Sequence, residues 1–139
     1  MSFLHTTEFD VEFGDCDPAG IVFYPNFFRW MDAASRHFFT AAGVPPWREF
    51  EAREGILGTP LVDASAHFER PATYGETIAI DTSIAEWRGK SFVMHHVIRR
   101  GAVKLAEGRE VRVFARRHPD DPARIQAVEV PTDIRKRVE

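Results

Sequence analysis

The sequence has a single cysteine, Cys16, and no apolar run that approaches the length of a membrane-spanning helix. One thiol excludes a disulfide scaffold and any zinc site built from several cysteines. A span needs roughly 18 apolar residues, so no membrane partner is expected. Residues 1–5 do not have the pattern of a secretory signal. We therefore expect a cytoplasmic protein.

The sequence also lacks an excess of positive charge. The net charge of −3 argues against a nucleic-acid partner, since phosphate-binding domains are usually basic. The charge is uneven, however: residues 1–87 carry 5 Lys and Arg against 14 Asp and Glu, whereas residues 88–139 carry 13 against 7. The basic second half is either a solvated strand surface or the seat of a polyanionic ligand.

No repeat or linker interrupts the 139 residues, which predicts one domain over residues 1–139. Residues 6–13 alternate as a strand does, and residues 25–42 follow a helical pattern. Pro25 suits the first helical position and Gly43 the C-terminal stop. The helix is apolar over most of its surface, which is typical of a buried helix. Further strands are expected at 61–69, 77–87, 91–100, 103–115 and 124–128, with short helices after Trp47 and from Pro131 to Val138.

This order predicts an α+β fold in which an antiparallel sheet wraps around one long helix, because both the sheet face and the helix must be buried. It does not match the alternation of a parallel βαβ protein.

The densest group of reactive side chains lies in the turn before the long helix. Asp15 and Asp17 lie between glycines, next to backbone N–H groups and the positive end of the helix dipole. Such an end suits an oxyanion or a polarised carbonyl, and a carboxylate beside it can attack that carbonyl or activate water. Alternatively, either aspartate merely caps the turn through its own backbone.

Other chemistry is less favoured. A thiolate at Cys16 could be activated near the helix end, but no histidine lies at a recognisable spacing from it, so a buried structural cysteine is favoured. His95 and His96 point to opposite faces of a strand, so no metal site is expected. Asp15 and Asp17 also have the spacing of the nucleophile motif of haloacid-dehalogenase phosphatases. That family has a parallel sheet with helical crossovers, whereas this sequence has one long helix before its strands, so this interpretation is rejected.

A second cluster of polar side chains lies in the turn within residues 87–92. Arg88 and Lys90 stand at a tight turn beside Ser91. Two cations and a hydroxyl can hold phosphate oxygens, although an ordinary polar hairpin tip has the same composition.

Residues 12–26, EFGDCDPAGIVFYPN, resemble the signature of the hotdog-fold acyl-CoA thioesterases, in their aspartate-dependent, aryl-CoA branch. The resemblance extends over nearly the whole chain, through residues 29–36, 45–48, 55–60, 86–93, 110–115 and 127–131. It implies a curved antiparallel sheet around one long helix. It also implies a homo-oligomer whose subunits pair edge to edge, with active sites at the dimer interface, often as a dimer of dimers.

The same resemblance implies roles for individual residues. Asp17 would be the catalytic carboxylate, as nucleophile or general base, and the Tyr24 backbone N–H would polarise the thioester carbonyl. Asp32, Trp47 and Thr59 would line an aryl pocket.

Asp32 lies on an otherwise apolar helix face, where a lone carboxylate needs a partner. That partner is either a phenolic hydroxyl of the substrate or Arg29 or Arg36, one turn away.

The resemblance further implies that Arg88, Lys90 and Ser91 contact the phosphates of coenzyme A. Gly89 departs from the family pattern, which has a second basic residue there, so one phosphate contact is in doubt.

The implied activity is hydrolysis of an aryl-CoA thioester, 4-hydroxybenzoyl-CoA or a close relative. It needs no cofactor, because coenzyme A is part of the substrate. A short-chain aliphatic acyl-CoA thioesterase and a non-catalytic acyl-CoA-binding module are the alternatives that the sequence leaves open.

Overall fold

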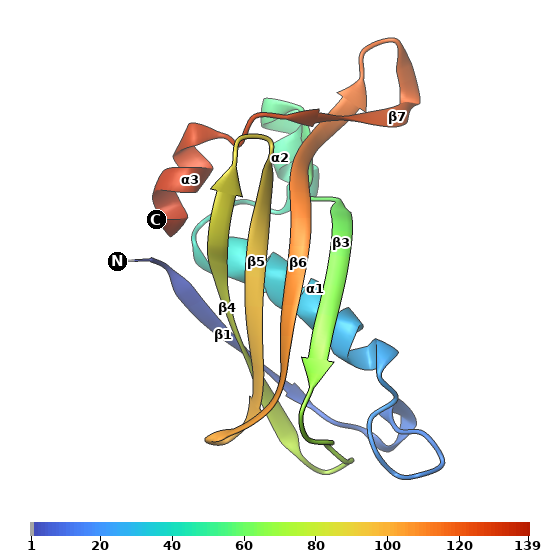
Figure 1. The fold of residues 1–139 in the computed structure, drawn as a ribbon. Coiled ribbons are helices and arrows are strands. Elements are labelled where there is room, and N and C mark those ends of the chain that lie inside the picture. The colour runs from blue at the N-terminus through green and yellow to red at the C-terminus, as the bar shows by residue number, and fades with distance from the viewer. Residues whose placement is uncertain (1) are drawn as a thin grey trace.

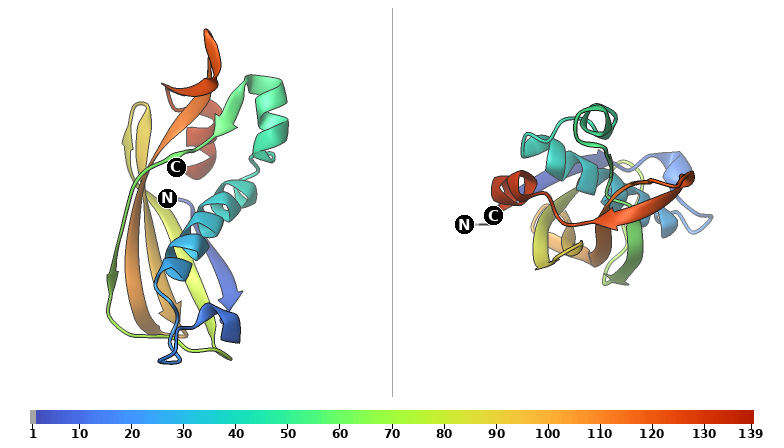
Figure 2. Two further views of the ribbon diagram at one scale, coloured as in Figure 1. Left: turned by 90° about the vertical axis from the view of Figure 1, so that its right-hand side faces the viewer. Right: turned by 90° about the horizontal axis from the view of Figure 1, so that it is seen from above.

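A computed structural model describes residues 2–139 and shows a curved antiparallel sheet with a long helix against one face (Figures 1 and 2). The strands are β1 (Leu4–Asp10), β2 (Ile56–Gly58), β3 (Leu61–Phe68), β4 (Thr77–Arg88), β5 (Ser91–Arg100), β6 (Val103–His118) and β7 (Asp121–Val128). The main sheet runs in the order β1-β4-β5-β6-β3. β2 and β7 pair with the C-terminal part of the long strand β6.

Helix α1 (Pro25–Ala41) packs into the concave face of the sheet, as Figure 2 shows. Its buried side chains recur at intervals of three or four residues, so they form one face; they are Phe27, Trp30, Met31, Ala34, Ser35, Phe38 and Phe39. Arg29, Asp32 and Arg36 lie on the opposite, exposed side. The helix is therefore buried along one face, not all round.

Two shorter helices close the end of the sheet near the C-terminus of α1. These are α2 (Trp47–Glu54) and α3 (Thr132–Val138), and α3 buries Ile134 and Val138. They contribute to a second apolar cluster around Phe38 and Phe39, separate from the cluster around Trp30 at the other half of the helix. No helix within residues 2–139 is long and apolar enough to cross a membrane.

A polar cluster lies in the interior beneath the middle of α1. It consists of the buried side chains of Ser35, Thr82, His96, Glu110 and Arg112. Charged groups are almost never fully buried unless they are paired, and the charged members of this cluster are paired with one another.

The α+β fold predicted from the sequence is confirmed, with three differences. The first strand ends at Asp10, because a short 3-10 turn begins at Phe13. A short additional strand, β2, precedes β3. β3 pairs with β6 and not with its sequence neighbour β4, so the chain crosses the sheet between them.

Candidate active site

The loop between β1 and α1 holds Asp17 in a defined position. The Asp17 amide donates to the Ile21 carbonyl at 2.9 Å, and the Gly20 amide donates to the Asp17 carbonyl at 2.9 Å. The Ala19 amide donates to Asp17 Oδ1 at 2.9 Å. Asp17 therefore does cap its own turn, but with one oxygen only. Within residues 2–139, Oδ2 has no hydrogen-bond partner and is available for chemistry.

Asp15, the second carboxylate of this loop, has a structural role. Its Oδ2 accepts a hydrogen bond from the Glu12 amide at 2.9 Å, and its Oδ1 pairs with Arg29 at 3.1 Å. Its carbonyl accepts from the Phe23 amide at 2.9 Å and from Asn26 Nδ2 at 2.8 Å. Because both oxygens of Asp15 are occupied, the geometry favours Asp17 as the reactive carboxylate.

Tyr24 is the N-cap of α1, and Pro25 occupies the first helical position, as the sequence predicted. Proline has no N–H, so the Tyr24 amide is the first donor at this helix end. In the part of the chain that the structure describes, this amide has no acceptor. A free N–H at the positive end of a helix dipole suits a carbonyl oxygen that gains negative charge.

An apolar cavity of about 310 Å³ adjoins this end of the helix, and its wall includes Tyr24, Phe27 and Phe68. The ring centroids of Phe27 and Phe68 are 5.4 Å apart, so the end of β3 packs directly against the first turn of α1.

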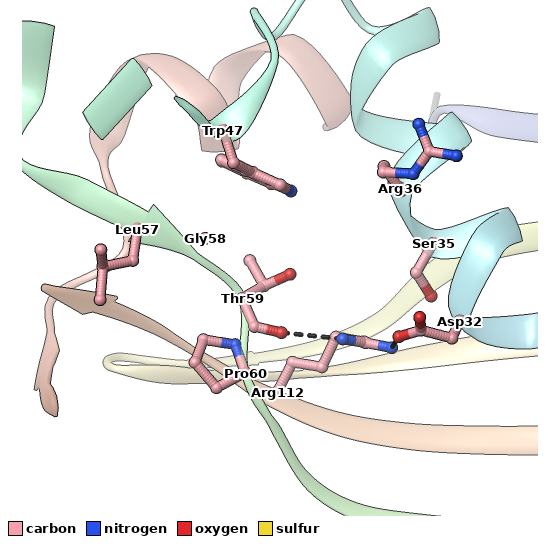
Figure 3. A pocket seen from close by; sticks show the side chains of 9 residues that line it. All are labelled: Asp32, Ser35, Arg36, Trp47, Leu57, Gly58, Thr59, Pro60 and Arg112. Atoms are coloured by element: carbon pink, nitrogen blue, oxygen red, sulfur yellow. Dashed lines mark hydrogen bonds and ion pairs between the residues drawn. The ribbon is translucent and has the colours of Figure 1, made fainter. Parts of the chain in front are cut away.

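A second cavity, of about 300 Å³, lies on the other side of α1 between the helix, α2 and the start of β3 (Figure 3). Its lining includes Asp32, Ser35, Trp47, Thr59, Pro60 and Arg112. The structure therefore brings together the three residues that the resemblance assigned to an aryl pocket. The Trp47 ring stands over Gly58 and edge-to-face against Phe39 at 5.7 Å, so its position is fixed by packing.

The carboxylate of Asp32 pairs with a residue that the sequence reasoning missed. Arg112 donates to Asp32 Oδ1 at 2.7 Å and to the Thr59 carbonyl at 2.8 Å. The alternative in which Asp32 pairs with Arg29 or Arg36 is wrong, since its carboxylate pairs with Arg112 and Arg29 pairs with Asp15. The Asp32 side chain is 70% exposed and faces the cavity.

Behind Arg112 lies the rest of the buried polar cluster. Arg112 also donates to Glu110 Oε2 at 2.7 Å, and His96 Nε2 lies 2.7 Å from Glu110 Oε1. Ser35 donates to the same Glu110 oxygen, and the Thr82 hydroxyl lies 2.8 Å from His96 Nδ1. Burial alone would raise the pKa of Glu110, but the hydrogen bonds from His96 and Arg112 lower it to about 2.

The sequence contains a pattern from which this buried cluster could have been predicted. Glu110 and Arg112 stand two residues apart on β6, and both occupy positions whose side chains face the interior. His96 occupies such a position on β5. His95 faces the other way and pairs with Glu107 at 2.5 Å on the outer surface. The prediction that His95 and His96 point to opposite faces is thus confirmed.

The remaining candidates lie away from Asp17. Arg88, Lys90 and Ser91 occupy the β4–β5 turn, at the opposite end of the sheet from the loop before α1 (Figure 1). Arg88 pairs with Glu86 at 3.0 Å, and Lys90 is exposed.

Cys16 is half-buried, and its sulfur lies 3.7 Å from the Glu12 carbonyl. Within residues 2–139, no group of three or more His, Cys, Asp or Glu side chains is arranged to hold a metal ion.

The chain resembles known proteins over almost its whole length. Residues 11–138 match the thioesterase-like superfamily. A 4-hydroxybenzoyl-CoA thioesterase of Pseudomonas sp. strain CBS-3 is 49% identical in an alignment that covers 88% of this chain and 89% of that protein.

Two solved structures extend the comparison. One is a 4-hydroxybenzoyl-CoA thioesterase with an aspartate-to-asparagine substitution, complexed with 4-hydroxybenzoyl-CoA. It superposes with a TM-score of 0.90 at 42% identity, covering 98% of this chain and 99% of that one. The other is a gentisyl-coenzyme A thioesterase, with a TM-score of 0.79 at 35% identity over 96% of this chain and 98% of that one.

Proposed function

This chain belongs to the thioesterase-like superfamily, and from that premise we propose that it hydrolyses 4-hydroxybenzoyl-CoA to 4-hydroxybenzoate and coenzyme A. The observation that carries the proposal is that the loop before α1 holds an Asp17 carboxylate oxygen and a Tyr24 amide that both lack hydrogen-bond partners within residues 2–139. The similarity to two aryl-CoA thioesterases supports the same substrate class.

In the proposed reaction, the Tyr24 N–H donates to the thioester carbonyl oxygen and stabilises the negative charge that develops there. Asp17 Oδ2 either attacks the carbonyl carbon or removes a proton from an attacking water. The first route expels coenzyme A thiolate and forms an anhydride, which water then hydrolyses. The second expels the thiolate directly. Both give the free acid and the thiol.

The two cavities would supply one composite site in a dimer. β3 pairs with β6 along one side only, so its other edge is open within residues 2–139. The Tyr24 cavity lies at the Phe68 end of β3, and the Asp32 cavity lies at its start, next to Pro60. Antiparallel pairing of two β3 edges brings the end of one strand beside the start of the other. Asp17 and Tyr24 of one subunit would then face Asp32, Trp47 and Thr59 of its partner.

In this arrangement the ring of the 4-hydroxybenzoyl group would enter the Asp32 cavity. There, Trp47 offers an aromatic wall, and Asp32 offers an acceptor for the ring hydroxyl. Arg88, Lys90 and Ser91 would hold the phosphates of coenzyme A.

Substitution of Asp17 tests the mechanism. In Asp17→Asn and Asp17→Ala, we expect thiol release from 4-hydroxybenzoyl-CoA to fall by a factor of about 10² or more while the ester still binds. Asp120→Asn, in the exposed β6–β7 turn, is the matched control and should retain full turnover. Full turnover by Asp17→Asn would reject the mechanism.

A panel of benzoyl, 4-hydroxybenzoyl, gentisyl and butyryl esters tests the substrate. We expect the hydroxylated aryl esters to be preferred. A preference for butyryl-CoA would favour an aliphatic thioesterase, and tight ester binding without thiol release would favour a binding module.

A further inference from the structure

Arg112 connects the Asp32 cavity, the cavity of about 300 Å³ between α1, α2 and the start of β3, to the buried polar cluster. Its side chain is 6% exposed, yet it reaches the cavity wall at two points. One terminal nitrogen donates to Asp32 Oδ1 at 2.7 Å, and the other donates to the Thr59 carbonyl at 2.8 Å. A single guanidinium thus fixes a helix side chain and the backbone that leads into β3, as the dashed lines in Figure 3 show.

The cluster behind Arg112 immobilises it. Glu110 accepts from Arg112 through both oxygens, at 2.7 and 3.3 Å. Glu110 is itself held by His96, which is fully buried, and by Ser35. Breaking a buried ion pair is strongly unfavourable, so Arg112 has no low-energy alternative position.

We propose that Arg112 is a positioning residue that makes the cavity selective for an acyl ring bearing a hydrogen-bond donor. It occupies Asp32 Oδ1 and leaves Oδ2 without a partner within residues 2–139. Figure 3 shows one Asp32 oxygen directed toward Arg112 and the other away from it. This inference rests on the proposed thioesterase function.

The selectivity follows from the chemistry of the exposed oxygen. A carboxylate oxygen with no proton can only accept hydrogen bonds. A ring hydroxyl can donate to Oδ2, whereas an unsubstituted ring would leave that oxygen desolvated without a partner. A site built to bind a hydroxyl in this way rejects the analogue that lacks it.

The test compares kcat/KM for 4-hydroxybenzoyl-CoA and benzoyl-CoA. In Arg112→Lys, which keeps the charge but loses the fork geometry, we expect the ratio of the two values to fall roughly tenfold or more. The loss should come mainly from a higher KM for the hydroxylated ester, with benzoyl-CoA little affected. Arg109→Lys is the matched control, because Arg109 lies on the same strand but is exposed on the outer face. An equal loss for both esters would overturn the proposal.

A double substitution separates positioning from a general structural role. Asp32→Asn should lower the same ratio, and adding Arg112→Lys should then lower it no further, because Arg112 acts through Asp32. A further drop in the double variant would overturn the proposal.

A structure of the wild-type chain with a non-hydrolysable thioether analogue of 4-hydroxybenzoyl-CoA needs no variant and no turnover. We expect the ring hydroxyl on Asp32 Oδ2 with Oδ1 still on Arg112. A hydroxyl bound elsewhere, or an Asp32 that has left Arg112, would overturn the inference. The proposed function fails separately, if the wild-type chain releases no thiol from any aryl ester.

Discussion

At the scale of single residues, the close approach of α1 to the sheet depends on a glycine. Gly108 lies on β6 directly beneath α1, and a Cβ built on it would overlap the Met31 sulfur. Met31 is fully buried, so its side chain can move aside only by repacking against its neighbours. A residue larger than glycine would therefore displace the Met31 side chain where the helix crosses the sheet.

Gly108→Ala should lower the free energy of unfolding by about 1–3 kcal/mol, the usual cost of overpacking a core. Urea unfolding at neutral pH measures it. Gly14→Ala is the control, because a Cβ there meets no atom within 4 Å. An unchanged midpoint in Gly108→Ala would show that the helix can shift without cost.

Glu110 predicts an acid-sensitive contribution to stability. Its pKa is lowered from 4.5 to about 2 in the folded protein. A lowered pKa means that the ionised form stabilises the fold, fully above pH 4.5, and that this stabilisation is lost as the pH falls toward 2. Glu110→Gln should therefore lower stability at pH 7 and flatten the dependence of unfolding free energy on pH in that window.

Glu107 provides the comparison, because its pKa is also lowered to about 2, by Lys104 and His95, but on the exposed outer face. Salt of about 1 M should screen the effect of Glu107→Gln and leave that of Glu110→Gln nearly unchanged. If salt abolished the effect of both substitutions on the pH dependence of stability, the explanation by a buried, unscreened Glu110 cluster would be contradicted.

At the scale of elements, the shape of the cavity beside Asp32 and Trp47 depends on how α2 meets β2. Gly58 ends β2 with a φ of 147°, and a Cβ there would lie 3.4 Å from the Trp47 ring. Gly55, at the end of α2, also has a positive φ of 76° but a Cβ would meet nothing within 4 Å. The two glycines share backbone strain and differ in their contact with the cavity wall.

Gly58→Ala and Gly55→Ala should each lower stability by roughly 1 kcal/mol or more, because alanine is unfavourable at positive φ. Only in Gly58→Ala does the added methyl group contact the Trp47 ring, at 3.4 Å, so only this variant should change the KM for aryl esters. Steady-state kinetics with 4-hydroxybenzoyl-CoA distinguishes them, and equal KM values in the two variants would argue against a role for Trp47 in binding the ring.

At the scale of the whole molecule, the proposed catalytic loop and the proposed ring pocket lie on different parts of one chain. Tyr24 and Asp32 are eight residues apart, about 12 Å along a helix axis, and they line different cavities. The open edge of β3 offers the geometry by which a second copy would join them.

This arrangement predicts complementation between two variants that are each impaired toward 4-hydroxybenzoyl-CoA. An Asp17→Asn chain mixed with an Asp32→Ala chain should form hybrid dimers in which one of the two sites is intact. Random mixing would recover about a quarter of the wild-type sites. A mixture of Asp17→Asn with Asp17→Ala should recover no activity. If the first mixture also recovers no activity although hybrid dimers form, the active site is not shared between two subunits.

The sequence alone determined the order of the long strands and helices and the local character of the loop before α1. Alternation and helical spacing are local properties, so the long strands and α1 could be predicted within a few residues. Pro25 fixed the start of α1, and the glycines around Asp17 fixed a turn there.

Only the tertiary structure decided which distant residues meet. β3 pairs with β6 across the sheet, and Arg112 lies 80 residues from Asp32 in the chain. Both contacts depend on strand order, which hydrophobic periodicity does not encode. Likewise, Asp15 and Asp17 differ in their hydrogen bonding, because Arg29 and the Glu12 amide occupy both carboxylate oxygens of Asp15 in the folded chain. The partner of a buried charged side chain is set by tertiary packing, and this packing forms only when the sheet folds around the helix.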